Sequence, residues 1–86
     1  GEVDLIAWDG PVLTFIDVKA RRGRAYGLPE VSITATKSER LIKVAYTYMQ
    51  AMETPPEDWR IDVVAIEFGV GGTVRRFEII KGVVEG

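Results

Sequence analysis

Four stretches of the chain have the hydrophobic pattern of β-strands, and one repeats apolar residues at helical spacing. The strands are expected at residues 3–8, 12–20, 60–68 and 74–80, which are rich in β-branched and aromatic side chains. Thr36-Lys37-Ser38-Glu39 fits a capping box, so a helix is expected to open at Thr36 and to end before Pro55-Pro56. Its apolar stripe consists of Leu41, Val44, Ala45, Tyr48, Met49 and Met52.

The connections between these elements predict an α/β fold. Asp9-Gly10 is a typical two-residue hairpin turn, and the glycine-rich residues 69–72 predict a second hairpin. A helix between the second and third strands permits a right-handed crossover and a parallel pairing. We therefore expect one domain over residues 1–86, with a mixed four-stranded sheet in the order strand, strand, helix, strand, strand. The first hairpin is apolar on both faces and is expected inside the sheet, whereas the single helix can cover only one face.

Composition removes several kinds of chemistry. Of the 86 residues, 47% are hydrophobic and 28% are charged, which is typical of a globular domain rather than a disordered chain. The chain contains neither cysteine nor histidine, which excludes disulfides, the usual zinc sites and a Ser-His-Asp triad. A metal bound here must have oxygen ligands, and Mg²⁺ or Mn²⁺ are the ions expected.

Charge is distributed unevenly along the chain. Between Lys19 and Lys43 there are seven basic and two acidic residues, a net charge of +5, although the whole chain carries −2. Such a basic segment suits a nucleic-acid backbone, although a solvated surface is the simpler alternative. The candidate DNA contacts in it are Arg21, Arg22, Arg24, Lys37 and Arg40. No apolar run approaches the ~20 residues of a membrane span, and no signal peptide is visible, so the cytoplasm is the expected location.

The candidate catalytic residues lie on the first two strands. Asp17 and Lys19 are two positions apart, so both side chains leave the same face of their strand. A turn at Asp9-Gly10 places Glu2 opposite Asp17, and it places Asp4 diagonally from Asp17, with backbones roughly 7–8 Å apart. Carboxylates this close resist joint ionisation unless a cation lies between them, so Asp4 and Asp17 are the candidate pair of metal ligands, and Glu2 converges on the same patch.

This arrangement predicts metal-dependent hydrolysis of a phosphodiester. The ion would activate a water and polarise a phosphoryl oxygen, and Lys19 would face the negative charge that grows on phosphorus or hold the attacking water. Asp4, Asp17 and Lys19 are thus the expected catalytic residues. The alternatives are that Asp17 and Lys19 form a surface ion pair and that Asp4 is an edge-strand charge. Asp62 is expected to pair with Arg60 or with a hairpin arginine.

These residues also fall into a pattern of longer blocks. The blocks are Gly1-Glu2-Val3-Asp4-Leu5-Ile6-Ala7, Phe15-Ile16-Asp17-Val18-Lys19-Ala20-Arg21, Thr34 to Lys37, and Arg60-Ile61-Asp62-Val63-Val64-Ala65-Ile66. The pattern resembles the bacterial YraN-like family, which is regarded as restriction-endonuclease-like, of the PD-(D/E)xK type, and related to Holliday-junction resolvases. The resemblance implies a restriction-endonuclease-like core in which Asp4 is the first acid, Asp17 and Lys19 form the (Asp/Glu)-x-Lys pair, and Glu2 lies near the metal. Lys37 and Asp62 match positions to which it assigns no role.

The chain departs from the family pattern in two respects. Asp17 stands where glutamate is usual, which shortens the side chain by one methylene. Members of the family normally carry a helical segment before the first motif, so the expected core lacks its N-terminal helix.

Three functions therefore compete. The first is an Mg²⁺- or Mn²⁺-dependent DNA endonuclease, selective for DNA structure. The second is a non-catalytic nucleic-acid-binding module on a nuclease fold. The third is a protein-interaction domain, in which the uncovered apolar sheet face forms a homodimer.

Overall fold

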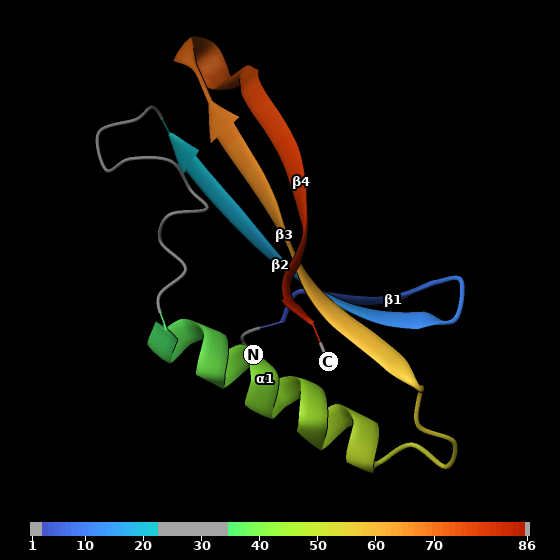
Figure 1. Ribbon diagram of the computed structural model, residues 1–86. Coiled ribbons are helices and arrows are strands. Elements are labelled where there is room, and N and C mark those ends of the chain that lie inside the picture. The colour runs from blue at the N-terminus through green and yellow to red at the C-terminus, as the bar shows by residue number, and fades with distance from the viewer. Residues whose placement is uncertain (1–2, 23–34, 86) are drawn as a thin grey trace.

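The computed structural model describes residues 3–22 and 35–85 (Figure 1). Its elements follow in the order β1 (Leu5–Asp9), β2 (Val12–Arg22), α1 (Ala35–Gln50), β3 (Asp58–Phe68), the 3₁₀ turn η2 (Val70–Gly72) and β4 (Val74–Glu85). The predicted α/β class and element order are confirmed. The helix begins one residue before the predicted N-cap, and β4 continues to Glu85 instead of ending at residue 80. The side-chain bonds of the predicted capping box lie outside the described residues.

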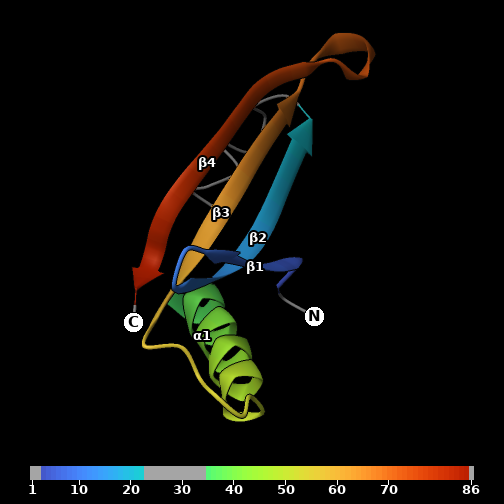
Figure 2. The same cartoon turned by 90° about the vertical axis from the view of Figure 1, so that its right-hand side faces the viewer.

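The four strands form one mixed sheet in the order β1-β2-β3-β4. β2 and β3 are parallel, as the crossover through α1 predicts, and the two outer pairs are antiparallel (Figure 2). β1 is an edge strand, and all five of its residues are exposed. The prediction that the first hairpin lies inside the sheet was wrong for β1, because no strand within the described residues pairs with its outer edge.

The β1–β2 turn differs by one residue from the prediction. Asp9 pairs with Val12, so the two loop residues are Gly10 and Pro11 rather than Asp9 and Gly10. Gly10 has φ 58°, and the proline ring holds the next φ near −65°. A positive φ followed by a negative one suits a type II′ hairpin, whose twist matches that of the strands.

The core lies between α1 and one face of the sheet. Leu13, Phe15 and Ile61 point from β2 and β3 toward the helix, which buries Leu41, Ala45 and Met49 against them. The predicted apolar stripe of the helix is thus confirmed at its centre, whereas Tyr48 stays 45% exposed while its ring meets the edge of Phe15. None of the described helices is both long and apolar enough to span a membrane.

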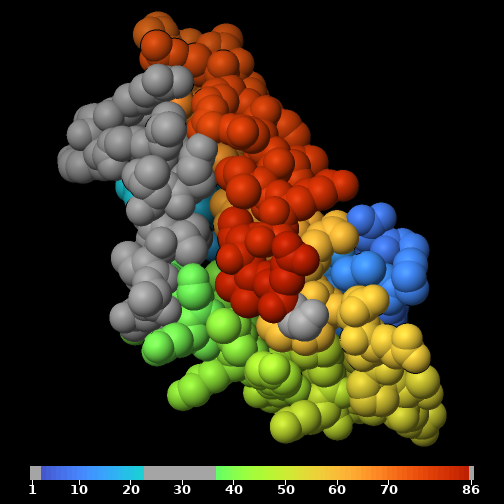
Figure 3. Space-filling view, viewed as in Figure 1, coloured from blue at the N-terminus to red at the C-terminus, as the bar shows by residue number. Residues whose placement is uncertain are grey.

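The opposite face of the sheet has no covering layer among the described residues. Leu5, Phe77 and Ile79 are each more than half exposed there. The expectation that one helix covers one face is therefore confirmed for the described part of the chain. Figures 1 and 3 show that α1 packs near the β1–β2 hairpin, while the β3–β4 hairpin extends away from the helix.

Candidate metal and phosphate site

Asp17 is a buried carboxylate in the middle of β2. The strand alternates, so Asp17 shares its face with Leu13 and Phe15, and only 3% of it is exposed. Lys19 Nζ lies 3.3 Å from Asp17 Oδ2, yet this oxygen has no partner with hydrogen-bond geometry among the described residues. A buried carboxylate oxygen in that state is costly unless a ligand occupies its lone pairs.

Asp4 lies beside Asp17 at the start of β1. The β1–β2 ladder ends where Leu5 pairs with Ile16, and the Asp4 N–H donates to the Ile16 carbonyl oxygen at 3.0 Å. The Val18 N–H donates to Asp4 Oδ2 at 2.8 Å, which fixes this carboxylate next to Asp17. Ile16 already pairs with Leu5, so the regular ladder ends there, and the side chain of Asp4 contacts that of Asp17. The predicted convergence of the two carboxylates is therefore confirmed, but the predicted register was wrong, because Phe15 pairs with Ile6 rather than with Asp4.

Two lysines complete the cluster. Lys19 follows Asp17 on the same face of β2, and Lys37 comes from the first turn of α1 to contact Lys19. Burial alone would lower the pKa of Lys19, but the attraction of Asp17 and Asp4 helps to raise it above its usual value. Lys19 therefore stays protonated at neutral pH and acts as a cation rather than a base.

The pKa of Asp17 is raised. Burial is the main cause, and the contact with Asp4 adds to it, whereas the charges of Lys19 and Lys37 oppose it. A carboxylate that is reluctant to ionise, next to a second carboxylate, is stabilised as an anion by a cation between them.

The donors present suit a small, hard divalent cation. Within residues 3–22 and 35–85, no group of three acidic side chains lies close enough to hold a metal by itself. Mg²⁺ is usually held by one or two protein carboxylates, with waters and substrate phosphates as its other ligands. Asp4 and Asp17, whose Oδ2 accepts no hydrogen bond from the described residues, meet that requirement. Glu2, the third predicted ligand, lies outside the described residues.

The described DNA-binding candidates lie on β2 and α1, the two elements that carry this cluster. Arg21 shares the face of Asp17 and Lys19 two positions further along β2, and Arg22 is exposed at the end of that strand. Arg40 is exposed on α1, one turn after Lys37. Arg24 lies outside the described residues.

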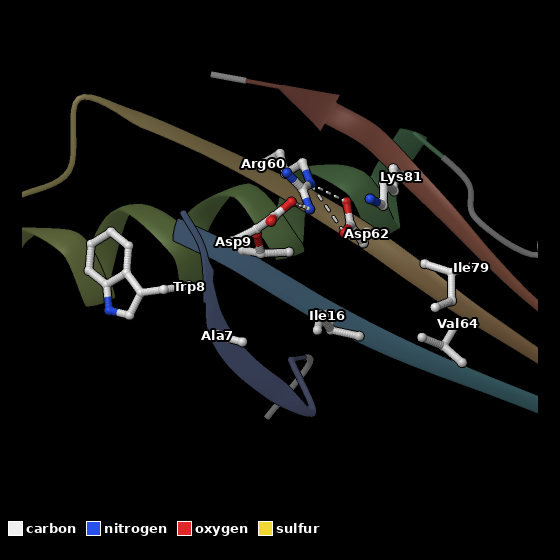
Figure 4. Close-up of a pocket in the computed structure, with 10 residues that line it drawn as sticks. Ala7, Trp8, Asp9, Ile16, Arg60, Asp62, Val64, Ile79 and Lys81 are labelled. Atoms are coloured by element: carbon white, nitrogen blue, oxygen red, sulfur yellow. Dashed lines mark hydrogen bonds and ion pairs between the residues drawn. The ribbon is translucent and has the colours of Figure 1, made fainter. Parts of the chain in front are cut away.

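Asp62 belongs to a different cluster on the opposite face of the sheet (Figure 4). Arg60 Nε donates to both carboxylate oxygens of Asp62, at 2.9 and 3.2 Å, and Arg60 Nη2 donates to Asp9 Oδ2 at 2.8 Å. The Gly82 N–H also donates to Asp62, at 2.9 Å. The prediction that Asp62 pairs with Arg60 is confirmed.

This second cluster stabilises the sheet. Gly82 has φ 66°, and the β3–β4 register shifts between Ile61 and Val63, opposite Asp62. Asp62 thus holds a bulge in β4, and Arg60 ties the β1–β2 hairpin to β3. The side-chain bonds to Asp62 and Asp9 raise the pKa of Arg60, and the bond from Arg60 lowers that of Asp9.

Sequence reasoning missed two charged residues that the structure shows to be paired, Glu67 and Asp9. Glu67 is completely buried in β3, and Arg75 Nε lies 4.0 Å from its Oε1. Its position between Ile66 and Phe68 in an apolar strand was the available signal. Asp9 was assigned to the turn, and its bond to Arg60 depends on residues 51 positions apart.

The fold and these residues define a small α/β protein with a carboxylate–lysine cluster on a mixed sheet. Residues 1–66 match the model of the uncharacterised protein family UPF0102. The chain belongs to this family, which comprises the YraN-like proteins that its motifs resemble. No solved structure shows significant similarity to it.

Several curated relatives carry the same family name. The chain is 48% identical over 75 residues to a UPF0102 protein of Symbiobacterium thermophilum, and the aligned region covers 87% of this chain and 64% of the relative. It is 42% identical over 78 residues to one of Pelotomaculum thermopropionicum, covering 91% and 65%. It is 38% identical over 85 residues to one of Syntrophus aciditrophicus, covering 99% and 65%. The chain thus spans just under two thirds of the length of these relatives.

Proposed function

We propose that this chain carries the catalytic core of a restriction-endonuclease-like, Mg²⁺- or Mn²⁺-dependent nuclease that hydrolyses DNA phosphodiester bonds. One observation carries the proposal. The buried Oδ2 of Asp17 has no hydrogen-bond partner among the described residues, and it lies beside a second carboxylate and two lysines. A cluster built only to stabilise the fold would satisfy that oxygen internally, as the opposite face does for Asp62.

Asp4 and Asp17 would hold the metal ion. Their spacing is set by the β1–β2 register and by the bond from the Val18 N–H to Asp4. The bound ion supplies an activated water and neutralises charge on the phosphoryl group.

The lysines would receive the phosphate. Lys19 stays protonated because its pKa is raised, so its ammonium is available to the negative charge that develops during hydrolysis. Lys37 contacts Lys19 from the first turn of α1. A phosphodiester in this site would then meet two lysines of the chain in addition to the metal.

Manganese titration by calorimetry tests the metal site. The wild-type chain is expected to bind Mn²⁺ and Asp17→Asn is expected to lose that binding. Asp62→Asn is the matched control, since it changes the other buried aspartate and is expected to bind normally. Binding that survives Asp17→Asn overturns this assignment of the site.

Cleavage assays test the reaction. Linear and branched duplexes are incubated with the chain in Mn²⁺, in Mg²⁺ and in EDTA. Cleavage that needs the divalent ion supports the proposal. Salt-sensitive DNA binding in EDTA with no cleavage in either metal would instead assign a non-catalytic binding module.

A further inference from the structure

The tip of the β3–β4 hairpin is a second feature that suits nucleic acid. It comprises Gly69, η2 and Thr73, and it lies at the end of the hairpin that is remote from α1 (Figures 1 and 3). Val70 at this tip is 97% exposed, which is the highest exposure among the large hydrophobic side chains described. An apolar side chain held this far into solvent gives the folded chain no packing energy of its own.

The tip has a defined shape. The Gly69 N–H donates to the Thr73 carbonyl oxygen at 2.8 Å, and Thr73 Oγ1 donates to the Val70 carbonyl oxygen at 3.0 Å. Gly71 and Gly72 have φ of 74° and 77°, a conformation that glycine adopts without strain. Val70 is therefore presented on a narrow, hydrogen-bonded turn whose other central residues lack side chains.

Positive charge flanks the tip. Arg22 at the end of β2 and Arg75 at the start of β4 line one shallow hollow together with Phe68 and Val70. Arg75 keeps 60% of its side chain exposed although its Nε lies 4.0 Å from the buried Glu67. Residues 68–77 contain Arg75 and Arg76 and no acid, but the flanking Glu67 and Glu78 pair with these two arginines. The cations that the tip presents to a polyanion are therefore Arg22 and the exposed part of Arg75.

The tip lies on the same strands as the metal and phosphate site. Asp17 pairs with Val63 and Arg22 with Phe68, so five residues of β3 separate the level of the site from the base of the tip. At about 3.3 Å per residue this is about 16 Å. The tip therefore reaches about 16 Å beyond the site in the direction of the strands.

We propose that the β3–β4 tip is a duplex-binding finger that enters the major groove beside the bond that the site would cleave. The partner, double-stranded DNA, rests on the proposed function. Arg22 and Arg75 bind phosphates at the rims of the groove, and Val70 contacts the apolar edges of bases such as the thymine methyl.

Dimensions favour the major groove. Paired strands lie about 4.7–4.9 Å apart between backbones. The major groove is about 12 Å wide and admits a two-stranded ribbon, whereas the minor groove is only about 6 Å wide. The glycines keep the end of the ribbon within that width.

A tethered cleavage reagent locates the tip on DNA. The chain has no cysteine, so Val70→Cys creates a unique thiol to which an iron–EDTA group is attached, in an Asp17→Asn background that removes cleavage by the site itself. We expect strong cuts at one position of a branched duplex, offset toward the 5′ ends as major-groove attack requires. Val83→Cys, at the far end of β4, is the matched control. The proposal is overturned if the reagent attached at Val70→Cys cuts DNA no more strongly than the reagent attached at Val83→Cys. It is also overturned if the cuts on the two strands are offset toward the 3′ ends.

Salt dependence tests the arginines. Arg22→Gln and Arg75→Gln are each expected to reduce the slope of log affinity against log salt by about one, the contribution of one phosphate contact. Arg22→Gln serves if Arg75→Gln disturbs the buried Glu67. Lys81→Gln, at the other end of β4, is expected to leave the slope unchanged. If Arg22→Gln shows the same slope of log affinity against log salt as Lys81→Gln, the proposal is contradicted.

The two proposals fail in different ways. Tethered cuts and salt slopes need no catalysis, so a chain that binds through the tip but never hydrolyses DNA refutes the nuclease and keeps the finger. Metal-dependent cleavage that is unaffected by changes at Val70, Arg22 and Arg75 refutes the finger and keeps the nuclease.

Discussion

Two buried aspartates on neighbouring parallel strands have opposite surroundings. Asp17 is 3% exposed with Lys19 two residues after it, and Asp62 is 4% exposed with Arg60 two residues before it. Asp62 accepts hydrogen bonds from Arg60 and from the Gly82 N–H, whereas Asp17 Oδ2 has an ion pair at 3.3 Å but no hydrogen bond among the described residues. The same two-residue spacing of an acidic and a basic residue thus produces a fully hydrogen-bonded carboxylate on one face of the sheet. On the other face it leaves a carboxylate oxygen without a hydrogen bond from the described residues.

Cleavage should separate the two aspartates most strongly. Asp17→Asn is expected to reduce metal-dependent cleavage to background, because the neutral amide is a poor ligand for a hard divalent ion. Asp62→Asn should retain the wild-type rate at saturating DNA. The measurement is single-turnover cleavage in Mn²⁺. Equal losses in both variants would mean that the two clusters act alike and would remove the basis of the comparison.

Stability should separate them in the other direction. Asp62→Ala leaves the Gly82 N–H and Arg60 without their acceptor, and the lost bonds to a buried carboxylate should lower the free energy of unfolding by about 2–3 kcal/mol. Urea unfolding measures this change. Asp58→Ala, an exposed aspartate at the start of the same strand, should change stability by less than about 0.5 kcal/mol. A stable Asp62→Ala variant would show that the clamp is dispensable.

Lys37 tests how far the Asp17 cluster extends. Lys37→Gln removes the helix-borne cation beside Lys19 and should slow single-turnover cleavage roughly 10-fold, less than the ~10²–10³-fold of a fully enclosed donor because water screens a half-exposed lysine. Lys43→Gln, an exposed lysine on the same helix, is the control. Unchanged cleavage in Lys37→Gln would confine the site to the strands.

The smallest expected effect is a pH-dependent change in stability. Because the pKa of folded Asp17 is raised above its ordinary value of 3.8, the folded chain binds the proton more tightly, and stability rises as pH falls through that pKa. At pH 7, without metal, Asp17→Asn should therefore have a slightly higher melting temperature than the wild type. The gain should shrink as the pH falls and the wild-type carboxyl takes up its proton. A variant less stable than wild type at pH 7 would show that the anion is satisfied.

The sequence predicted what local pattern determines. Alternation along residues 12–20 was enough to place Asp17 and Lys19 on one face, and the helical stripe correctly identified Leu41, Ala45 and Met49 as core. The parallel pairing followed from the crossover rule. These features depend on residues close in sequence, where periodicity carries the information.

The rest depends on contacts between distant residues. Pro11 can occupy the second loop position and lets Asp9 join the strand, which moved the turn by one residue and the β1–β2 pairing by two residues from the prediction. Lys37 contacts Lys19 because α1 packs against the face of the sheet that carries Lys19. Asp62 acts through a bulge at Gly82, 20 residues later, which no pattern around Asp62 reveals.

The two-residue β1–β2 turn also limits how this family can vary. Asp4 contacts Asp17 because a two-residue turn sets the β1–β2 register up to the Leu5–Ile16 pair, and the Arg60–Asp9 pair holds the turn end of this hairpin. Adding or deleting one residue in that turn would rotate Asp4 to the open face, whereas a change of two would preserve the arrangement. Insertions tolerated by evolution in this hairpin should therefore come in even numbers, so that the length of a surface turn becomes a marker of whether a relative has kept its site.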